Sequence, residues 1–403
     1  MNIVYITKNA QFPYGNAGTN RLLSYIPGLV AAGHSVTVLC MWLLDKQNQE
    51  LLDSKASCFF QGIKIKYVSG KTLWPKSGSR LILKAYLLFK AHISIILYLI
   101  KNRVKIDIVQ LYVADIKFYH FCSWWCHLLK LKIVLERSEL PDIIKKRDYY
   151  IKTKKGIKYI RKSEKSFGLF DAWILETQTL LDYYGKFFSY NTKCLLVPMT
   201  VEVERFTNIK EKRNNMFGYY IAYCGNMSEY DGVSILIRAY SLVRVNHPNI
   251  KLVLAGDSDN VPNLKFLAES LGVKDDVLFI GKISRDEVPS FLSNATILAL
   301  ASPTSDRACA TMPCKVGEYL CTANPVVVTG LGEINKYLKD GESAFLSQPD
   351  SPEAFAAKIE EVFDDMSKAK EVGLNGKQVA IDNFSSEAQV KRIEDFYKEL
   401  IKT

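Results

Sequence analysis

The stretch of the chain that most constrains its fold runs from Thr296 to Gly330. It opens with an apolar run, Thr296 to Ser302, that has the length of a buried strand, and continues with a loop of small, polar and proline residues. A short helix is predicted from Cys314 to Thr322, because the residue before Pro325 disfavours helical geometry. The valine-rich run from Pro325 to Thr329 is typical of a second buried strand. Parallel strands require such a crossover, so the stretch predicts an α/β domain with a parallel sheet.

The start of this helix is the candidate ligand site. The first amides of a helix, here near Pro313 and Cys314, have no intrahelical partner, and the positive end of the helix dipole favours an anion such as a diphosphate. Glu318 lies one turn further along the same face, about 5–6 Å away. A diphosphate at the helix start and a ribose beside Glu318 are therefore geometrically compatible. A surface glutamate on an ordinary crossover helix would show the same spacing.

The residues of this stretch resemble a family signature. PCKVGEYL at Pro313–Leu320, followed by ANPVVV at Ala323–Val328, is similar to the signature of family-4-like retaining glycosyltransferases with the GT-B fold (glycosyl transferases group 1). In that family the glutamate matching Glu318 binds the ribose of the donor nucleotide, and amides at the helix start hold its diphosphate. The resemblance implies two Rossmann-like, doubly wound parallel-sheet domains facing a cleft, with a C-terminal helix that crosses back to the N-terminal domain.

The resemblance also implies the reaction. We expect metal-independent transfer of a sugar from a nucleotide-sugar, with UDP-sugar one option, to a glycan or lipid-linked acceptor with retention of anomeric configuration, in cell-surface polysaccharide synthesis. The chain has 403 residues, 48% of them hydrophobic, which suffices for two domains. LVPMTVEVERF at Leu196–Phe206 resembles the family's interdomain segment. We therefore predict an acceptor domain at 1–198, a donor domain at 199–383 and a crossover helix at 384–403.

Glycines that follow predicted strands are further donor-binding candidates, because glycine lets a ligand approach the backbone at the carboxyl ends of parallel strands. The first domain opens with a strand, a loop, a helix predicted from Arg21 to Ala32 and a second strand from Ser35 to Cys40. No acidic residue ends this second strand, which disfavours a nicotinamide-binding domain. The triplet Asp257-Ser258-Asp259 could hold a divalent cation, yet a lone triplet is weak evidence and we expect no metal. The candidates from these turns are Gly15, Gly18, Gly225, Asn226, Gly256, Asp257 and Gly281.

The acceptor side has two candidate carboxylates, Glu136 and Glu139, at the end of a predicted strand. They could orient an acceptor hydroxyl, or pair with the basic run that follows. The family often has a histidine near the preceding strand, and His120 is the nearest candidate here. Its aromatic neighbours make a packing role more probable than a catalytic one.

The chain departs from the family pattern at the cations that grip the diphosphate. Asn226 and Asp231 occupy the positions that usually carry Arg or Lys, and Ala310 occupies that of a second glutamate. We expect Arg307, which we also place among the catalytic residues, or Lys315 to supply the missing positive charge. The alternative is a catalytically weak GT-B protein that acts as a scaffolding partner of an active transferase.

The net charge of +11 is concentrated in the first half of the chain. Lys and Arg outnumber Asp and Glu by 30 to 13 in residues 1–200, whereas acids lead by 29 to 23 in residues 201–403. No nucleic-acid-binding motif accompanies this charge. Leu81–Ile100 is long enough to span a bilayer, but Lys90 and His92 oppose insertion, and a crossover helix is needed at this point. With the basic run Lys145–Lys165, it indicates an anionic membrane surface as a possible partner.

The cysteines and the N-terminus bear on location. Nine cysteines, an odd number, are scattered through apolar and loop contexts, and the first residues lead directly into a strand pattern without the order of a secretory signal. Reduced thiols are therefore expected. We predict a cytoplasmic protein, peripheral on the inner face of the membrane if the basic half meets lipid.

Overall fold

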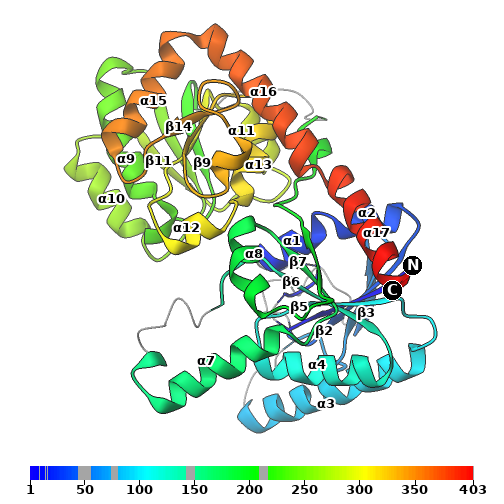
Figure 1. Cartoon of the computed structure of the whole chain (residues 1–403). Coiled ribbons are helices and arrows are strands. Elements are labelled where there is room, and N and C mark those ends of the chain that lie inside the picture. The colour runs from blue at the N-terminus through cyan, green and yellow to red at the C-terminus, as the bar shows by residue number, and fades with distance from the viewer. Residues whose placement is uncertain are drawn as a thin grey trace. The chain divides into compact units, whose positions relative to one another are not determined.

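The computed structural model describes residues 1–8, 10–13, 15, 17–43, 56–73, 80–141, 150–207 and 217–402, without the side chains at 17, 80, 81 and 307. Its contacts divide the chain into two units (Figure 1). Unit 1 comprises Met1–Val197 and Gln389–Thr403, and unit 2 comprises Pro198–Ala388. The chain passes from one unit to the other at positions close to the predicted boundaries at 198 and 383.

Unit 1 contains an eight-stranded sheet of order β3-β4-β2-β1-β5-β6-β7-β8. All of its neighbouring strands pair in parallel except β3 and β4, which are antiparallel. Chain order reverses beside β1, which lies between β2 and β5. The strands are β1 Asn2–Thr7, β2 Ser35–Cys40, β3 Ser57–Phe60, β4 Ile63–Tyr67, β5 Ile108–Tyr112, β6 Lys132–Arg137, β7 Ala172–Leu175 and β8 Lys193–Leu196.

Helices connect these strands, and the final helix of the chain returns to unit 1. One helix predicted at 21–32 is instead two, α1 Ala17–Leu23 and α2 Ile26–Ala31, because Pro27 stands in the first turn of α2 and cannot donate a backbone hydrogen bond. Val390, Ile393, Tyr397 and Leu400 of the last helix join the apolar core of unit 1. The helices are α3 Arg80–Asn102, α4 Ile116–Leu128, α7 Lys154–Phe167, α8 Gln178–Tyr184 and α17 Ser386–Lys402, with a 3-10 turn η2 at Gly185–Phe187.

Helix α3 is a surface crossover helix between β4 and β5. Its inner face is apolar and buried at Leu87, Ala91, Ile95 and Leu99, which follow one another at intervals of one turn. Within the described residues, Ile82–Asn102 is the one helix whose length and composition would let it cross a membrane. The contacts of its inner face instead make it part of the wall of unit 1.

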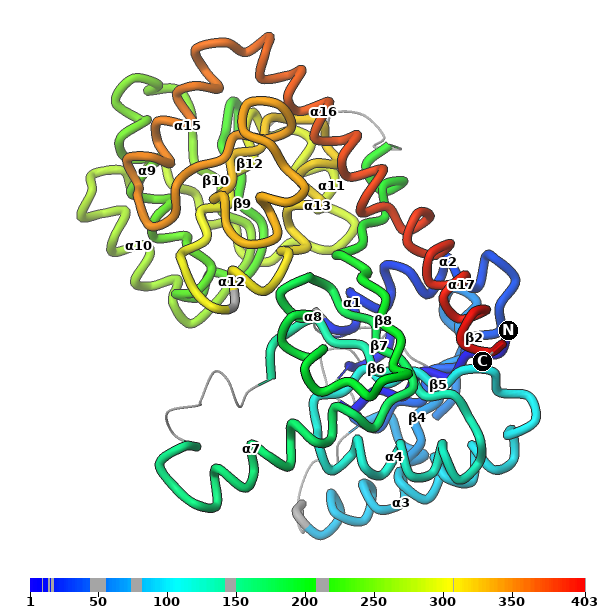
Figure 2. The backbone as a smooth tube through the Cα atoms, viewed as in Figure 1, coloured from blue at the N-terminus to red at the C-terminus, as the bar shows by residue number. Residues whose placement is uncertain are grey.

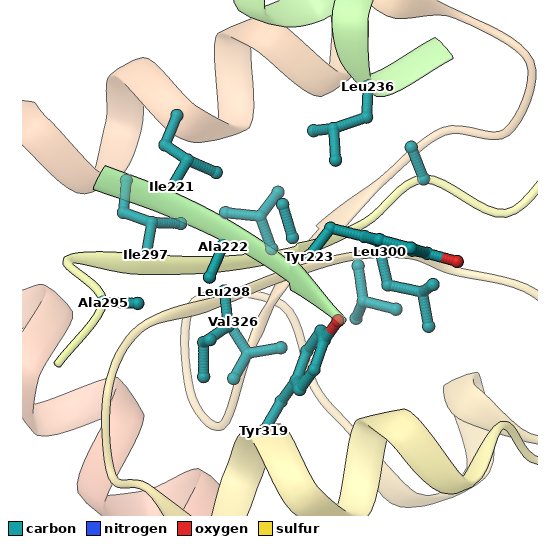
Figure 3. Packing of buried hydrophobic residues seen from close by; sticks show 14 of the residues in the cluster. Ile221, Ala222, Tyr223, Leu236, Ala295, Ile297, Leu298, Leu300, Tyr319 and Val326 are labelled. Carbon is teal, nitrogen blue, oxygen red and sulfur yellow. The ribbon is translucent and has the colours of Figure 1, made fainter. Parts of the chain in front are cut away.

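Unit 2 is a six-stranded, wholly parallel sheet of order β11-β10-β9-β12-β13-β14. Chain order reverses between β9 and β12, and open α/β sheets bind ligands at such a switch point, beyond the carboxyl ends of the strands. Figure 3 shows Ile221, Leu298 and Val326 of this sheet packed together in the core. The strands are β9 Tyr220–Cys224, β10 Lys251–Ala255, β11 Val277–Gly281, β12 Ile297–Leu300, β13 Val326–Thr329 and β14 Phe345–Ser347.

The helices of unit 2 follow the predicted alternation, with one addition. The predicted loop after β12 contains a short helix, α12 Asp306–Ala310, whose amide at Ala308 is capped by the Ser305 hydroxyl. The backbone tube in Figure 2 shows α12 in the connection that leads to α13. The others are α9 Val233–Asn246, α10 Val261–Ser270, α11 Val288–Ser293, α13 Cys314–Cys321, α14 Ile334–Tyr337, α15 Pro352–Asp364 and α16 Met366–Phe384, with 3-10 turns η3 Val203–Phe206 and η4 Glu229–Asp231.

Candidate active site

Helix α13 lies where the sequence placed it, between the parallel neighbours β12 and β13. Pro313 occupies its N-cap and gives no side-chain hydrogen bond to the helix amides, and Cys314 at the first position is exposed. The inner face of the helix is buried at Val316 and Leu320. The amides at the start of α13 therefore lie at a surface, beside the switch point of the sheet.

Lys315 reaches from α13 to the turn that follows β9. A Cβ atom added to Gly225 would lie 2.1 Å from Cε of Lys315, so no side chain is accommodated there while the lysine holds this position. Gly225 itself has φ of 147°, in the region that favours glycine. The lysine consequently brings a positive charge to the loop whose expected cations are missing from Asn226 and Asp231.

The ammonium group of Lys315 is held by Tyr223 and Asp231. Its Nζ donates to the hydroxyl of Tyr223 at 2.6 Å and to Oδ1 of Asp231 at 3.1 Å, and it lies 4.7 Å from the centre of the Tyr223 ring. Asp231 also accepts from Nδ2 of Asn226 at 2.8 Å and from the hydroxyl of Ser228 at 2.5 Å. Burial acts to raise the pKa of Asp231, but Lys315 and these hydrogen bonds outweigh it and lower the pKa below its usual value.

Glu318 belongs to a second ion cluster on the same helix. Its Oε1 lies 3.4 Å from Nη1 of Arg205, and its side chain is 31% exposed. Arg205 also donates to the backbone carbonyl of Arg285, whose guanidinium lies 2.5 Å from Glu202. Burial raises the pKa of Glu318, and the charges of Arg205 and Arg285 oppose this only in part. The carboxylate is thus oriented by a partner from η3 and remains accessible.

The other turns require glycine for different structural reasons. A Cβ on Gly256 would lie 1.8 Å from the carbonyl oxygen of Gly225, so the turns after β9 and β10 pack directly on each other. Gly281 has φ of 74° and open space around it, so backbone conformation favours glycine there. Asp257 is largely exposed and lies 3.8 Å from Lys282. Among the described residues no three His, Cys, Asp or Glu side chains gather as metal ligands, and metal independence stays a prediction.

The segment after β12 contains two other residues that the sequence analysis singled out. Ala310 is buried, and its methyl group offers no polar contact to a sugar. Arg307 lies on α12, but its side chain falls outside the described part of the chain. Its proposed roles stay predictions.

Glu136 is not an accessible acceptor-binding group, which corrects the expectation from sequence. It is 2% exposed on β6, and its Oε1 lies 3.0 Å from Nε of Arg21. Its Oε2 accepts from the Tyr25 hydroxyl and from Nε2 of Gln110, each at 2.6 Å. Because one cation and two neutral donors surround the carboxylate inside the core, its role in this structure is to stabilise unit 1.

The remaining candidates in unit 1 lie apart from that network. Glu139 follows β6 with an exposed side chain, and its carbonyl accepts from the Tyr184 hydroxyl at 3.0 Å. Gly15 is tightly enclosed, since a Cβ would lie 2.2 Å from Oγ1 of Thr19, whereas Gly18 is part of α1. His120 is exposed on α4 rather than buried in an aromatic core. Of the two carboxylates predicted to face the acceptor, Glu139 is thus the one that lies at the surface.

Three residues of the site were missed by the sequence argument. Tyr223, Arg205 and Arg285 all contact the ion clusters of α13, yet they come from a strand, a 3-10 turn and a loop far apart in the chain. A usable signal existed for one of them, because Arg205 precedes Phe206 in the segment that resembles the family's interdomain motif. Tyr223 and Arg285 carried none.

Comparison with known sequences identifies the region that contains this site. Residues 204–379 match the sequence model of the family described as Glycosyl transferases group 1. An uncharacterized glycosyltransferase of Methanocaldococcus jannaschii is 25% identical over 178 residues, 44% of each chain. An alpha-D-kanosaminyltransferase of Streptomyces kanamyceticus is 22% identical over 180 residues, 45% of each chain. The chain therefore spans somewhat less than half the length of these relatives.

Comparison with solved structures extends over the whole chain. A sucrose-phosphate synthase from Thermosynechococcus elongatus aligns with a TM-score of 0.74 at 15% identity, covering 100% of this chain and 99% of the other. The HepE protein of Anabaena, solved in complex with UDP-glucose, aligns with a TM-score of 0.71 at 15% identity, covering 99% and 100%. At this identity the likeness concerns the fold alone, and it confirms the predicted α/β fold with two Rossmann-like domains.

Proposed function

We infer that this protein is a group 1 glycosyltransferase with the GT-B fold, which transfers a sugar from a nucleotide-sugar donor to a glycan or lipid-linked acceptor. The family match covers most of unit 2 and contains Lys315, Glu318 and all the glycine turns discussed there. Retention of configuration, independence of a metal, a cytoplasmic location and a role in cell-surface polysaccharide synthesis belong to the same proposal.

The observation that carries the proposal is the pair of charged groups on α13. Lys315 points to the glycine turn after β9, whereas Glu318 lies one turn along the helix with part of its carboxylate accessible. The lysine and the helix start would hold the diphosphate, and the glutamate would accept hydrogen bonds from the ribose hydroxyls. One short helix thereby provides a group of the required charge for each half of a nucleoside diphosphate.

These groups also suggest how the chain assists departure of the diphosphate. Negative charge grows on the leaving phosphate as the bond to the sugar breaks, and a positioned ammonium together with helix amides stabilises that charge. Lys315 would supply the ammonium, with Arg307 as a second cation. Glu139 is our candidate within unit 1 for binding an acceptor hydroxyl.

The experiment that tests the proposal is calorimetric titration with UDP, GDP, ADP and dTDP and their sugars. Glu318→Ala should weaken binding of the preferred nucleotide by about 1.5–3 kcal/mol, the range for a lost charge-assisted hydrogen bond. Glu269→Ala is the matched control, because it removes an exposed glutamate of unit 2 that is paired with Lys274 on the surface. Unchanged nucleotide affinity in a folded Glu318→Ala variant would refute the assignment of the site.

A second candidate function, that of a catalytically weak scaffold, has one observation in its favour. Asp231 lies 3.1 Å from the ammonium of Lys315 and offsets the charge that a diphosphate would need. An active transferase should show stronger nucleotide binding in Asp231→Asn, because the lysine then loses its competing anion. A scaffold should show no thermal shift with any nucleotide-sugar in either protein.

A further inference from the structure

The outer face of α3 carries an apolar stripe that no described part of unit 1 covers. The stripe consists of six residues at helical spacing, each between 41% and 75% exposed: Ile82, Tyr86, Phe89, Ile93, Leu97 and Ile100. It lies opposite the buried face of the same helix. Helices of soluble proteins rarely expose so continuous an apolar surface, so a binding partner is implied.

The surface continues from α3 onto α4. His92 of α3 packs edge-on against Phe121 of α4, with ring centres 4.8 Å apart. The exposed face of α4 then presents Trp124, 59% exposed, and Leu128, 58% exposed, one turn apart. A hollow on this helix is lined by His120, Phe121, Trp124, Trp125, Leu128 and Leu169, together with Ser123 and His127. The exposed apolar area therefore spans two neighbouring helices, which run side by side in Figure 1.

Helix α7 adds positive charge beside this apolar area. It contacts α4, and Lys162 of α7 is close enough to His120 to help lower the pKa of that imidazole, after the larger effect of burial. Six cations of α7 are exposed: Lys154, Lys155, Lys158, Arg161, Lys162 and Lys165. Glu164 is the one acidic residue in the sequences of α3, α4 and α7. The area thus combines exposed aromatic and aliphatic side chains with a nearly acid-free cationic border.

We propose that α3, α4 and α7 form a docking surface for an anionic lipid bilayer, with the α3 stripe entering the headgroup region and the α7 cations meeting lipid phosphates. Aromatic and aliphatic side chains insert favourably at this depth, and each cation near an anionic membrane strengthens binding. The α3 helix lies in the plane of the membrane, because its other face belongs to the core of unit 1. A second copy of this chain, with its net charge of +11, would bring like charges to the cationic border. The proposal is independent of sugar transfer, since docking requires no nucleotide.

The test is co-sedimentation of the full chain with phosphatidylcholine vesicles that contain or lack phosphatidylglycerol, across a salt series. We expect binding to the anionic vesicles that weakens steeply with salt, because screening shortens from about 10 Å at 0.1 M to about 3 Å at 1 M. Phe89→Glu/Leu97→Glu should reduce the partition coefficient about a hundredfold, by about one order of magnitude for each of the two apolar anchors removed. Lys154→Gln/Lys155→Gln/Lys158→Gln/Lys162→Gln should reduce it at least about a hundredfold.

The matched control is Phe266→Glu/Leu374→Glu, which changes the same residue types in unit 2. Phe266 is 72% exposed and Leu374 is 61% exposed, compared with 66% for Phe89 and 61% for Leu97. Equal losses in the two double variants, equal binding to both vesicle types, or no binding would overturn the proposal. A dimer seen in sedimentation velocity that depends on the α3 stripe, in a protein that does not bind vesicles, would also overturn it. If the Glu variants do not fold, tryptophan fluorescence with brominated lipid gives a second test. Quenching in wild type that is lost in Trp124→Phe supports the proposal, and an absence of quenching in wild type refutes it.

Discussion

The buried carboxylate of Glu136 gives the sharpest test of what holds unit 1 together. In Glu136→Ala, the Arg21 guanidinium, whose side chain is 4% exposed, loses its carboxylate, and the donors of Tyr25 and Gln110 lose their acceptor. Removing one partner of a buried ion pair costs about 3–5 kcal/mol, because the remaining charge stays desolvated. Against a typical free energy of unfolding of about 5–15 kcal/mol, that loss is large.

The chain offers a specific probe for this measurement. All five tryptophans lie within residues 1–198, so tryptophan emission during urea denaturation reports the unfolding of unit 1. Glu139→Ala is the matched control, because it removes an exposed carboxylate from the same strand end and should change stability by less than about 0.5 kcal/mol.

A double variant separates the ion pair from the other contacts of the network. Arg21→Met/Glu136→Leu should be less destabilised than the sum of the two single variants, because the loss of the Arg21–Glu136 ion pair is then counted once instead of twice. The reasoning would be refuted by a Glu136→Ala protein that unfolds within about 1 kcal/mol of wild type. Loss of sugar transfer in such a stable protein would restore Glu136 as an acceptor-binding residue.

Further predictions concern unit 2. Neutralising both Arg307 and Lys315 to Gln should abolish transfer, while either change alone weakens it in a steady-state assay; unaltered kinetics in the double variant would contradict this. Because the pKa of Glu318 is raised, nucleotide affinity should decline as pH falls towards that pKa, which lies above the ordinary 4.5, and titrations of Glu318→Gln should lack this decline. Because the pKa of Asp231 is lowered, its charge stabilises the folded state at pH values above the unfolded-state pKa of 3.8. Calorimetry should show this contribution to stability disappear as the pH falls through the folded-state pKa. The contribution should be absent at every pH in Asp231→Asn. Gly256→Ala should lower the free energy of unfolding of unit 2, measured by calorimetry, by at least about 2 kcal/mol, because the added Cβ would meet a backbone oxygen. Gly272→Ala should lower it by less, because a Cβ there meets nothing within 4 Å.

Local sequence patterns predicted the elements of the fold because they rest on interactions between residues close in the chain. The valine-rich run became β13, and the helix predicted to begin at Cys314 became α13. Local sequence patterns predicted element boundaries less well where a single residue changed the backbone conformation. Pro27 divided one predicted helix into two, and the Ser305 hydroxyl initiated α12 inside a predicted loop.

The sequence by itself determined that unit 2 has parallel strands, that α13 begins after Pro313, and that Lys315 and Glu318 share this helix. These features follow from periodicity, proline chemistry and helical spacing. Only the tertiary structure decided the partners of each charge. The strand order brought β9 beside β12 and thereby Gly225, Tyr223 and Asp231 to Lys315. It likewise enclosed Glu136 among Arg21, Tyr25 and Gln110. The physical reason is that burial and electrostatics depend on distances in space between segments remote in the chain, which no local spacing encodes.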